Sequence, residues 1–197
     1  MKVVLADYGA GNTRSVCAAL ARAGAEPIVS TAPEEIRKAR LAVIAGVGHV
    51  ASAARGIAPV EEALRARAAA GRPILGICVG MQLFFEESEE GGRGLGLLAG
   101  PVQRLRASRV PHMGWNELTS VRDSRLLDGL EDADVYFAHS FAVVPADDIV
   151  IAHVDHEGAV IAAVESGQLA GVQFHPERSG AAGARLLENA LAWSRSA

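Results

Sequence analysis

Short apolar runs recur through the first part of the chain, and each run ends at a glycine or a polar turn. The runs cover residues 2–6, 27–30, 41–45 and 73–77. Continuous apolar runs of this length, bounded by turn residues, are typical of strands that are buried on both faces. Between these strands, apolar spacing and capping residues predict helices over residues 13–22, 33–39 and 57–70. This alternation indicates a parallel sheet with helices on both faces.

The pattern changes after Glu90, where glycines become frequent. Shorter strand-like segments follow, at 102–106, 134–143, 149–154, 159–164 and 169–174. Tight turns separate the last three segments, which predicts an antiparallel meander. A final amphipathic helix is expected over 182–194. We therefore expect an α/β fold in a single domain over residues 1–197: a mixed, mostly parallel central sheet with helices on both faces and an antiparallel C-terminal meander.

Composition and charge narrow the classes of protein. Hydrophobic residues make up 50% of the 197, enough for one sizeable core. Nineteen basic residues against 23 acidic ones give a formal charge of −4 without a strongly basic block, which argues against nucleic acid as a partner. No apolar run approaches the roughly 18 residues of a membrane-spanning helix, and Asp7 comes too early for a secretory signal. With only two cysteines, too few for a disulfide scaffold, the chain is expected to be cytoplasmic.

The segment from Arg72 to Phe85 carries the most informative chemistry. Its apolar strand runs into Cys78, which has a glycine two residues to either side, and a helix-like apolar stretch follows. A residue at a sharp strand-to-helix turn, where glycines relieve crowding, has the geometry of a nucleophile elbow. The first N–H groups of the helix would favour the thiolate there. The alternative is a buried structural cysteine, which is the role expected for Cys17 inside the first helix.

A second chemical signal ends the meander, in the segment G-V-Q-F-H-P-E at 171–177. On an extended chain, His175 and Glu177 are two residues apart and both side chains can point the same way. Pro176 donates no hydrogen bond, which suits the end of a strand. A histidine oriented by a carboxylate is the base that a cysteine nucleophile requires, whereas the alternative is a surface pair without function. Combined with an elbow cysteine, the pair predicts a Cys-His-Glu triad.

Two glycine-bearing loops follow predicted strands, D-Y-G-A-G-N at 7–12 and G-V-G-H at 46–49. In open parallel sheets, ligands bind at the carboxyl ends of the strands, where both loops and Cys78 converge. The first loop lacks the third glycine of a dinucleotide motif, and no P-loop is present, so no cofactor is expected. No metal is expected either, because the nearest candidate ligands, His153, Asp155 and His156, lie in a solvated turn of the meander.

The elbow segment G-I-C-V-G-M-Q-L and the segment G-V-Q-F-H-P-E resemble the class I glutamine amidotransferases, whose triad is Cys-His-Glu and whose fold is flavodoxin-like. Six further segments are similar to the glutaminase subunit of imidazole glycerol phosphate synthase, from histidine biosynthesis. They are D-Y-G-A-G-N at 7–12, G-V-G at 46–48, S-E-E-G at 88–91, G-L-G-L-L at 94–98, V-P-H-M-G-W-N at 110–116 and Y-F-A-H-S-F at 136–141. The resemblance spans essentially the whole chain in order.

The resemblance implies roles for individual residues. Cys78 would attack the glutamine carboxamide, His175 would move the proton and Glu177 would hold the imidazole. Backbone N–H groups would form the oxyanion hole, from residues Val47, Gly48 and Val79. Five residues would line the glutamine pocket: Gln82, Glu90, His139, Ser140 and Phe141. A carboxylate at Glu90 suits the ammonium of an amino acid substrate, while a helix-face glutamine, a solvated acidic run and a core histidine are the alternative interpretations for members of this set.

The resemblance also implies a partner. Ammonia would pass to a cyclase chain, which is a (β/α)8 barrel, in a heterodimer that forms imidazole glycerol phosphate and the aminoimidazole carboxamide ribotide. The candidate interface residues are Asn12, Trp115, Asn116, Tyr136 and Arg178. Neither nucleic acid nor membrane is expected as a partner.

Three positions depart from the usual family pattern. Ala45 stands where proline usually opens the oxyanion strand, which predicts a more mobile loop. Phe141 stands where tyrosine is frequent, so a hydroxyl contact to glutamine is lost. Arg178 stands where lysine is common, which keeps the charge and changes its geometry.

Two alternatives to this function remain at this point. A glutaminase of pyridoxal phosphate, GMP or anthranilate synthesis would keep the triad but should lack P-H-M-G-W-N and the opening glycine loop. A non-catalytic binding module of the same fold would usually lose the cysteine or the histidine, and both are present here.

Overall fold

The computed structural model describes residues 1–9, 12–120 and 122–195. Residues 10 and 11 of the predicted loop at 7–12 therefore lie outside the described residues. The centre of the fold is an eight-stranded sheet. Its strands follow the order β2 (Glu26–Ser30), β1 (Lys2–Ala6), β3 (Leu41–Gly46), β4 (Ile74–Cys78), β13 (Leu169–Val172), β12 (Ala159–Ser166), β11 (Val150–Asp155) and β8 (Thr119–Ser120).

In this spatial order, the first five strands, which end at β13, are joined by parallel pairs. The last three strands, β12, β11 and β8, are added by antiparallel pairs. The expected mixed, mostly parallel sheet with an antiparallel C-terminal meander is confirmed. The central strands are continuous apolar runs because both of their faces are covered, and all six residues of β3 are buried.

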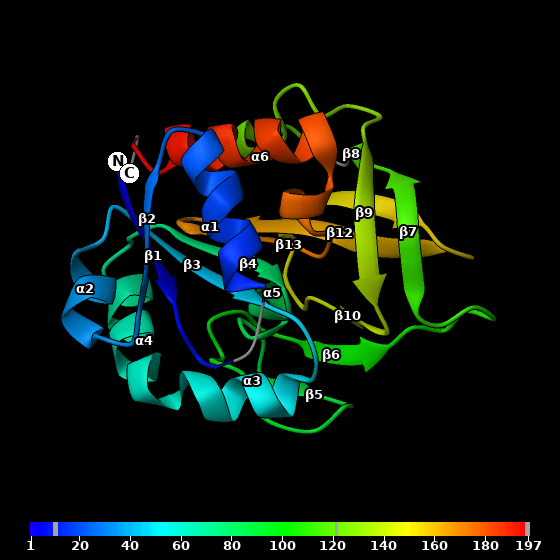
Figure 1. The fold of residues 1–197 in the computed structure, drawn as a ribbon. Helices are drawn as coiled ribbons and strands as arrows, with labels where there is room; N and C mark the ends of the chain where they lie inside the picture. The colour runs from blue at the N-terminus through cyan, green and yellow to red at the C-terminus, as the bar shows by residue number, and fades with distance from the viewer. Residues whose placement is uncertain (10–11, 121, 196–197) are drawn as a thin grey trace.

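Helices cover both faces of the sheet (Figure 1). On one face lie α1 (Thr13–Arg22) and α6 (Gly180–Trp193), and on the other lie α3 (Val50–Ile57) and α4 (Glu61–Ala69), with α2 (Pro33–Lys38) packed against α4. Cys17 packs against the core from α1, as expected. No helix of the described residues is long and apolar enough to cross a membrane.

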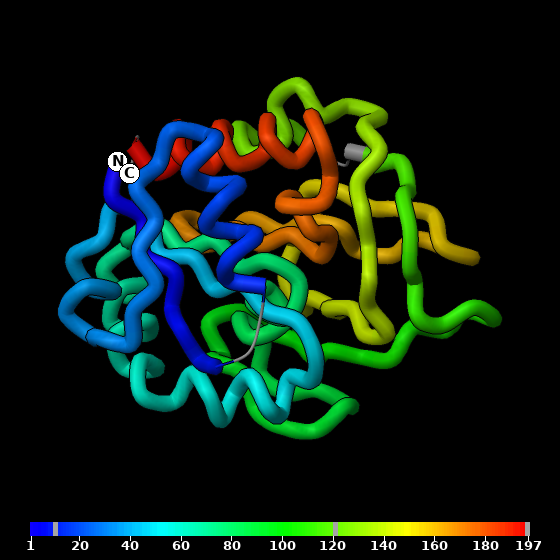
Figure 2. Tube along the Cα trace, viewed as in Figure 1, coloured from blue at the N-terminus to red at the C-terminus, as the bar shows by residue number. Residues whose placement is uncertain are grey.

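Two smaller sheets flank the carboxyl end of the central strands. One has the order β10 (Phe141–Val143), β6 (Pro101–Arg104) and β5 (Glu87–Ser88), and the other is a ribbon of β7 (His112–Glu117) and β9 (Asp134–His139). The C-terminal segment returns to the same side of the molecule as the N-terminus (Figure 2). The carboxyl ends of the parallel strands, away from the termini, face the two smaller sheets.

Three predicted elements were wrong in their bounds. The helix expected over 57–70 begins with a 3-10 turn, η1 (Ala58–Val60), because Pro59 lacks the N–H that a continuous helix needs there, and α4 follows it; α3, which ends at Ile57, was not predicted. The strand expected over 134–143 ends at His139, and the chain passes from the β7 ribbon to the β6 sheet through Ser140. The helix expected after Cys78 is a single turn, α5 (Val79–Gln82), so it supplies less dipole than a long helix would.

Candidate active site

Cys78 lies at a strained turn between β4 and α5. Its φ of 53° and ψ of −113° are rare for a residue with a side chain, and only 3% of its surface is exposed. The turn is tight because α5 passes directly over the neighbouring strand. A Cβ added to Gly80 would lie 1.7 Å from the carbonyl oxygen of Ile44 in β3, and one added to Gly76 would lie 2.7 Å from the carbonyl oxygen of Gly80. The two glycines therefore permit the elbow.

We expect Gly80→Ala to lower the free energy of unfolding by about 3 kcal/mol or more, because its methyl group would overlap backbone that cannot turn aside. The measurement is the urea unfolding midpoint of the variant against the parent. Gly71→Ala is the matched control: its φ is +62° and no atom lies within 4 Å of an added Cβ. That control should lose only about 1 kcal/mol, and equal losses in the two variants would contradict the close approach.

His175 and Glu177 lie beside the elbow, at the end of β13. His175 has an extended backbone, but Glu177 lies in the 3-10 turn η3 (Pro176–Arg178), so the extended geometry predicted for the pair was wrong. The turn begins at Pro176 and brings the carboxylate back to the ring. Glu177 Oε1 lies 2.9 Å from His175 Nδ1, and both side chains are almost fully buried, at 5% and 1% exposed.

The charge state of His175 follows from its neighbours. Burial alone lowers the pKa of His175, but hydrogen bonds to Cys78 and Glu177 and the charges of both groups outweigh it and raise the pKa to about 10. A protonated ring has two N–H donors, one for Cys78 and one for Glu177. This arrangement favours the protonated, imidazolium form of His175 near neutral pH.

Backbone contacts from the β7 ribbon fix the position of His175. Its N–H donates to the carbonyl oxygen of Tyr136 in β9 at 2.8 Å. The Ser179 hydroxyl donates to the carbonyl oxygen of His175 at 2.7 Å and accepts from the N–H of Tyr136 at 3.0 Å. The backbone of His175, which follows β13, is therefore anchored to β9.

The predicted oxyanion loop follows β3 and is anchored at both ends. Before the loop, the buried Tyr8 hydroxyl donates to the carbonyl oxygen of Ala45 at 2.8 Å. Burial and the nearby Cys78 raise the pKa of Tyr8, so the hydroxyl stays protonated as a donor. After the loop, the N–H of Val50 donates to Glu90 Oε2 at 2.8 Å. Tyr8 thus supplies an anchor at the position where the family usually has proline.

A cavity of about 280 Å³ opens beside Cys78. This volume is near the lower end for small-molecule sites. The cavity is lined by two of the predicted oxyanion residues and all five predicted pocket residues, together with four further residues: Gly48, Val79, Gln82, Glu90, His139, Ser140, Phe141, His49, Pro111, Met113 and Ala138. Val47, the third predicted oxyanion residue, is 43% exposed and does not line this cavity.

Glu90 is not a solvated residue of an acidic run. Its side chain is 14% exposed, and Oε1 lies 2.7 Å from Nδ1 of the exposed His49. Because Oε2 accepts from the N–H of Val50, the carboxylate joins the cavity wall to the first turn of α3. An ammonium group in the cavity would therefore meet a carboxylate that is already held in place.

His139 belongs to a group of buried aromatic and imidazole rings behind the cavity. Its Nδ1 lies 2.9 Å from the carbonyl oxygen of Phe141, and its Nε2 lies 3.1 Å from Nδ1 of His112. Burial lowers the pKa of His139 to about 3 and that of His112 to about 4, so both rings are neutral. His156, which was expected to be solvated, instead stacks on His112 with ring centroids 4.1 Å apart.

Three of the predicted interface residues form one cluster beside His175. The guanidinium carbon of Arg178 lies 4.0 Å from the ring centroid of Tyr136, whose ring is edge-on to Trp115 at 6.1 Å. Trp115 is 58% exposed, which is unusual for so large a side chain. Asn116, by contrast, already donates to the carbonyl oxygen of Asp155 at 2.7 Å. Asn12 precedes α1 without a side-chain capping bond.

Sequence reasoning missed two residues that contact this centre, Tyr8 and Gln173. Gln173 is fully buried, and its Nε2 lies 3.5 Å from Sγ of Cys78. Its position two residues before His175, in the strand expected over 169–174, was a usable signal, since alternate residues of an extended chain point to the same side. Tyr8 gave no such signal, because only the fold brings its hydroxyl to Ala45.

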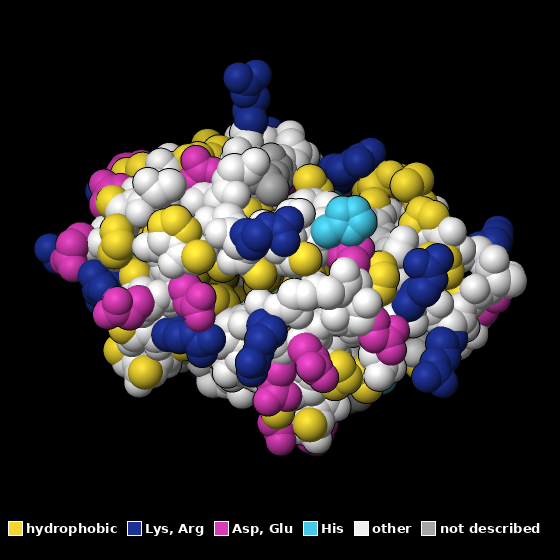
Figure 3. Space-filling model, turned by 90° about the horizontal axis from the view of Figure 1, so that it is seen from below, with side chains coloured by type: hydrophobic (Ala, Val, Ile, Leu, Met, Phe, Trp, Pro, Cys, Tyr) yellow, Lys and Arg dark blue, Asp and Glu magenta, His cyan; other side chains and the backbone are white. Residues whose placement is uncertain are grey.

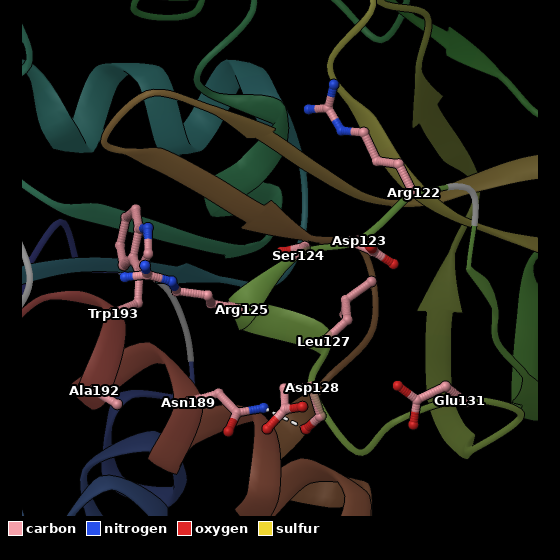
Figure 4. A pocket seen from close by; sticks show the side chains of 10 residues that line it. All are labelled: Arg122, Asp123, Ser124, Arg125, Leu127, Asp128, Glu131, Asn189, Ala192 and Trp193. Atoms are coloured by element: carbon pink, nitrogen blue, oxygen red, sulfur yellow. Dashed lines mark hydrogen bonds between the residues drawn. The ribbon is translucent and has the colours of Figure 1, made fainter.

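A larger cavity of about 590 Å³ lies elsewhere, between α6 and the 3-10 turn η2 (Arg125–Leu127). Figure 4 shows its mixed lining, with Arg125 and Trp193 on one side and Asp128 and Glu131 on the other. This cavity shares no lining residue with the cavity beside Cys78. On the face seen in Figure 3, basic and acidic side chains are interspersed without one extended patch of a single sign. Within the described residues, no group of three or more His, Cys, Asp or Glu side chains could hold a metal ion.

Comparison with known proteins identifies the family. Residues 4–193 match the family described as glutamine amidotransferase class-I. The solved structure of PurLQS from Thermotoga maritima has a TM-score of 0.77 over 98% of this chain and 98% of its own, at 23% identity. That likeness concerns the fold alone. The chain belongs to the class I glutamine amidotransferases.

Curated relatives narrow the family further. The chain is 42% identical to the imidazole glycerol phosphate synthase subunit HisH of Methanothermobacter thermautotrophicus, over 95% of this chain and 96% of that protein. It is 45% identical to subunit HisH of Geobacillus kaustophilus, over 93% of this chain and 92% of that protein. Within the class I amidotransferases, the chain therefore belongs with the HisH subunits.

Proposed function

We propose that this chain is the glutaminase subunit of an imidazole glycerol phosphate synthase, and that Cys78, His175 and Glu177 are its catalytic triad. One observation carries the proposal. Cys78 lies at a strained elbow in the wall of a cavity, beside an imidazole that Glu177 orients at 2.9 Å. The 41–45% identity to HisH subunits supports the choice of synthase over other amidotransferases.

The first half of the reaction makes a thioester. The Cys78 thiolate attacks the side-chain carbonyl carbon of glutamine, and the C=O electron pair moves onto oxygen. The N–H of Val79, at the start of α5, and the N–H groups of the 46–48 loop would stabilise the oxyanion. As the C–N bond breaks, the imidazolium of His175 gives its proton to the nitrogen, which leaves as ammonia.

The second half restores the enzyme. His175 is now neutral and takes a proton from water, which attacks the γ-glutamyl thioester. Cys78 leaves as thiolate and glutamate is released. Glu177 holds the ring in one orientation throughout and stabilises its charged form, which agrees with the raised pKa of His175.

The cavity lining supports glutamine as the substrate. At one side, Glu90 would bind the α-ammonium, and at the other, Cys78 meets the carboxamide. Gln82, His139, Ser140 and Phe141 would complete the pocket. Because Phe141 has no hydroxyl, the pocket has one hydrogen-bonding group fewer than it would have with a tyrosine at that position.

The partner proposed is the cyclase of the synthase, a (β/α)8 barrel that would receive the ammonia and use it to form imidazole glycerol phosphate and the aminoimidazole carboxamide ribotide. The exposed cluster of Trp115, Tyr136 and Arg178 lies where a partner could contact the backbone of β9 that holds His175. A partner seated there would affect the position of the imidazole directly.

We expect the isolated chain to hydrolyse glutamine slowly, and the cyclase with bound nucleotide to raise that rate. The measurement is glutamate release by the chain alone, with the cyclase, and with the cyclase and nucleotide. Rapid turnover by the isolated chain, unchanged by the cyclase, would refute the proposed partnership.

A further inference from the structure

Among the described residues, Gln173 is the one side-chain amide that donates a hydrogen bond to the proposed nucleophile. It follows β13 and is completely buried, and its Nε2 lies 3.5 Å from Sγ of Cys78 in the neighbouring strand. This distance is suitable for a hydrogen bond to the larger sulfur atom. A fully buried amide so close to a nucleophile needs a reason, because burying a polar group is costly unless it is hydrogen-bonded.

The neighbours of Gln173 determine which of its two terminal atoms faces the sulfur. The carbonyl oxygen of Phe141 can only accept, so the Gln82 atom 2.8 Å from it is the nitrogen Nε2. The same nitrogen lies 3.0 Å from the end of Gln173, which must therefore present its oxygen there. The other terminal atom of Gln173, the one beside Cys78, is then a donor.

A histidine shares the carbonyl oxygen of Phe141 with Gln82. His139 Nδ1 also donates to the carbonyl oxygen of Phe141, at 2.9 Å, and His139 Nε2 accepts from Nδ1 of His112 at 3.1 Å. Because a carbonyl oxygen can only accept, His139 Nδ1 carries the hydrogen, and the Nε2 of this neutral ring must accept. Turning the amide of Gln173 would place two N–H groups, those of Gln82 and Gln173, against each other in a buried site.

We propose that Gln173 is a positioning residue for the nucleophile, and that its Nε2–H group holds Sγ of Cys78 and stabilises the thiolate, with Gln82 fixing the amide from behind. The inference rests on the proposed role of Cys78. Both N–H groups of Gln82 are already used, so its Oε1 remains as the acceptor toward the cavity. A ligand that contacts Gln82 is therefore connected to Sγ of Cys78 through the side-chain amide of Gln173.

The test is the pH dependence of Cys78 alkylation by iodoacetamide in the full chain, with Cys17→Ser so that a single thiol reacts. Gln173→Met removes the donor at similar volume, and Gln173→Glu keeps the acceptor for Gln82 but removes the donor and adds negative charge. We expect alkylation at pH 6 to slow about tenfold in the Met variant and further in the Glu variant, because a hydrogen bond to the thiolate is lost. At high pH, where every thiol is ionised, the rates should converge.

The control is Asn189→Leu, which removes another buried amide that donates to the carbonyl oxygens of Leu126 and Asp128, far from Cys78. Its alkylation profile should match that of the parent. A loss by the same factor at every pH, or an unchanged profile in Gln173→Met, would overturn the inference, and if the Met variant does not fold, the profile of Gln173→Glu decides. Alkylation requires no glutamine turnover, so this result is independent of whether the chain proves to be a glutaminase.

Discussion

Replacing Cys78 with serine is expected to lower the glutamine-dependent rate of the complete synthase by about a thousandfold or more. Serine has nearly the same volume, but its hydroxyl is not ionised by the neighbouring imidazolium and is a far weaker nucleophile than a thiolate. The buried elbow should fold unchanged, because the strain at φ 53° belongs to the backbone and not to the sulfur. The lost rate would therefore reflect the weaker nucleophile and not a change in the fold.

The measurement compares glutamine with added ammonia as the nitrogen source for the cyclase. The Cys78→Ser complex should keep its ammonia-dependent rate, which shows that the two chains still assemble. Cys17→Ser, a change of the same type in α1 away from the cavity, should keep both rates. Glutamine use retained by Cys78→Ser would remove this residue from its proposed role.

Replacing Glu177 with glutamine is expected to lower the glutamine-dependent rate by up to about 10⁴, the loss seen when the carboxylate that orients a catalytic histidine is neutralised. The substitution keeps the shape and removes the charge that lies 2.9 Å from Nδ1 of His175. Because Glu177 is one of the groups that raise the pKa of His175, this pKa should fall in the variant. The imidazolium of His175, which gives its proton to the leaving ammonia, is then lost at a lower pH. The alkaline limb of the rate profile should therefore shift to lower pH.

This prediction is checked by the pH profile of glutamine hydrolysis in the complex, for the parent and Glu177→Gln. Glu157→Gln is a suitable control, since Glu157 is an exposed carboxylate that contacts Ser108 and does not line the Cys78 cavity. The control should match the parent. An unshifted alkaline limb in Glu177→Gln would mean that the carboxylate does not set the protonation of His175.

Local patterns were sufficient to predict the centre of the fold. β1, α1 and α2 lie within a residue of their predicted bounds, because a continuous apolar run between turn residues is typical of a buried strand and because Pro33 and Gly24 limit the helices. The elbow was also predictable, since the glycines around Cys78 are required by close backbone approach. The family resemblance is confirmed by the match over residues 4–193.

Other features depend on contacts between distant parts of the chain. The change of sheet at Ser140 arises because β9 pairs with β7 while β10 pairs with β6, and a single apolar run gives no sign of two partners. Gln173 reaches Cys78 only because β13 lies beside β4 in a parallel register. Likewise, the hydrogen bond from Tyr8 to Ala45 joins the loop after β1 to the end of β3, and the two residues are distant in sequence.

The central claim is that Cys78 attacks the carboxamide carbon of a glutamine bound in the adjoining cavity. A diazoketone analogue of glutamine, which presents an electrophilic carbon at that position, tests this claim most directly when the labelled peptides are identified by mass spectrometry. We predict covalent modification of the peptide that contains Cys78, prevented by excess glutamine and absent when His175 is replaced by alanine. Labelling of Cys17 instead, or labelling of Cys78 that glutamine does not prevent, would contradict the account.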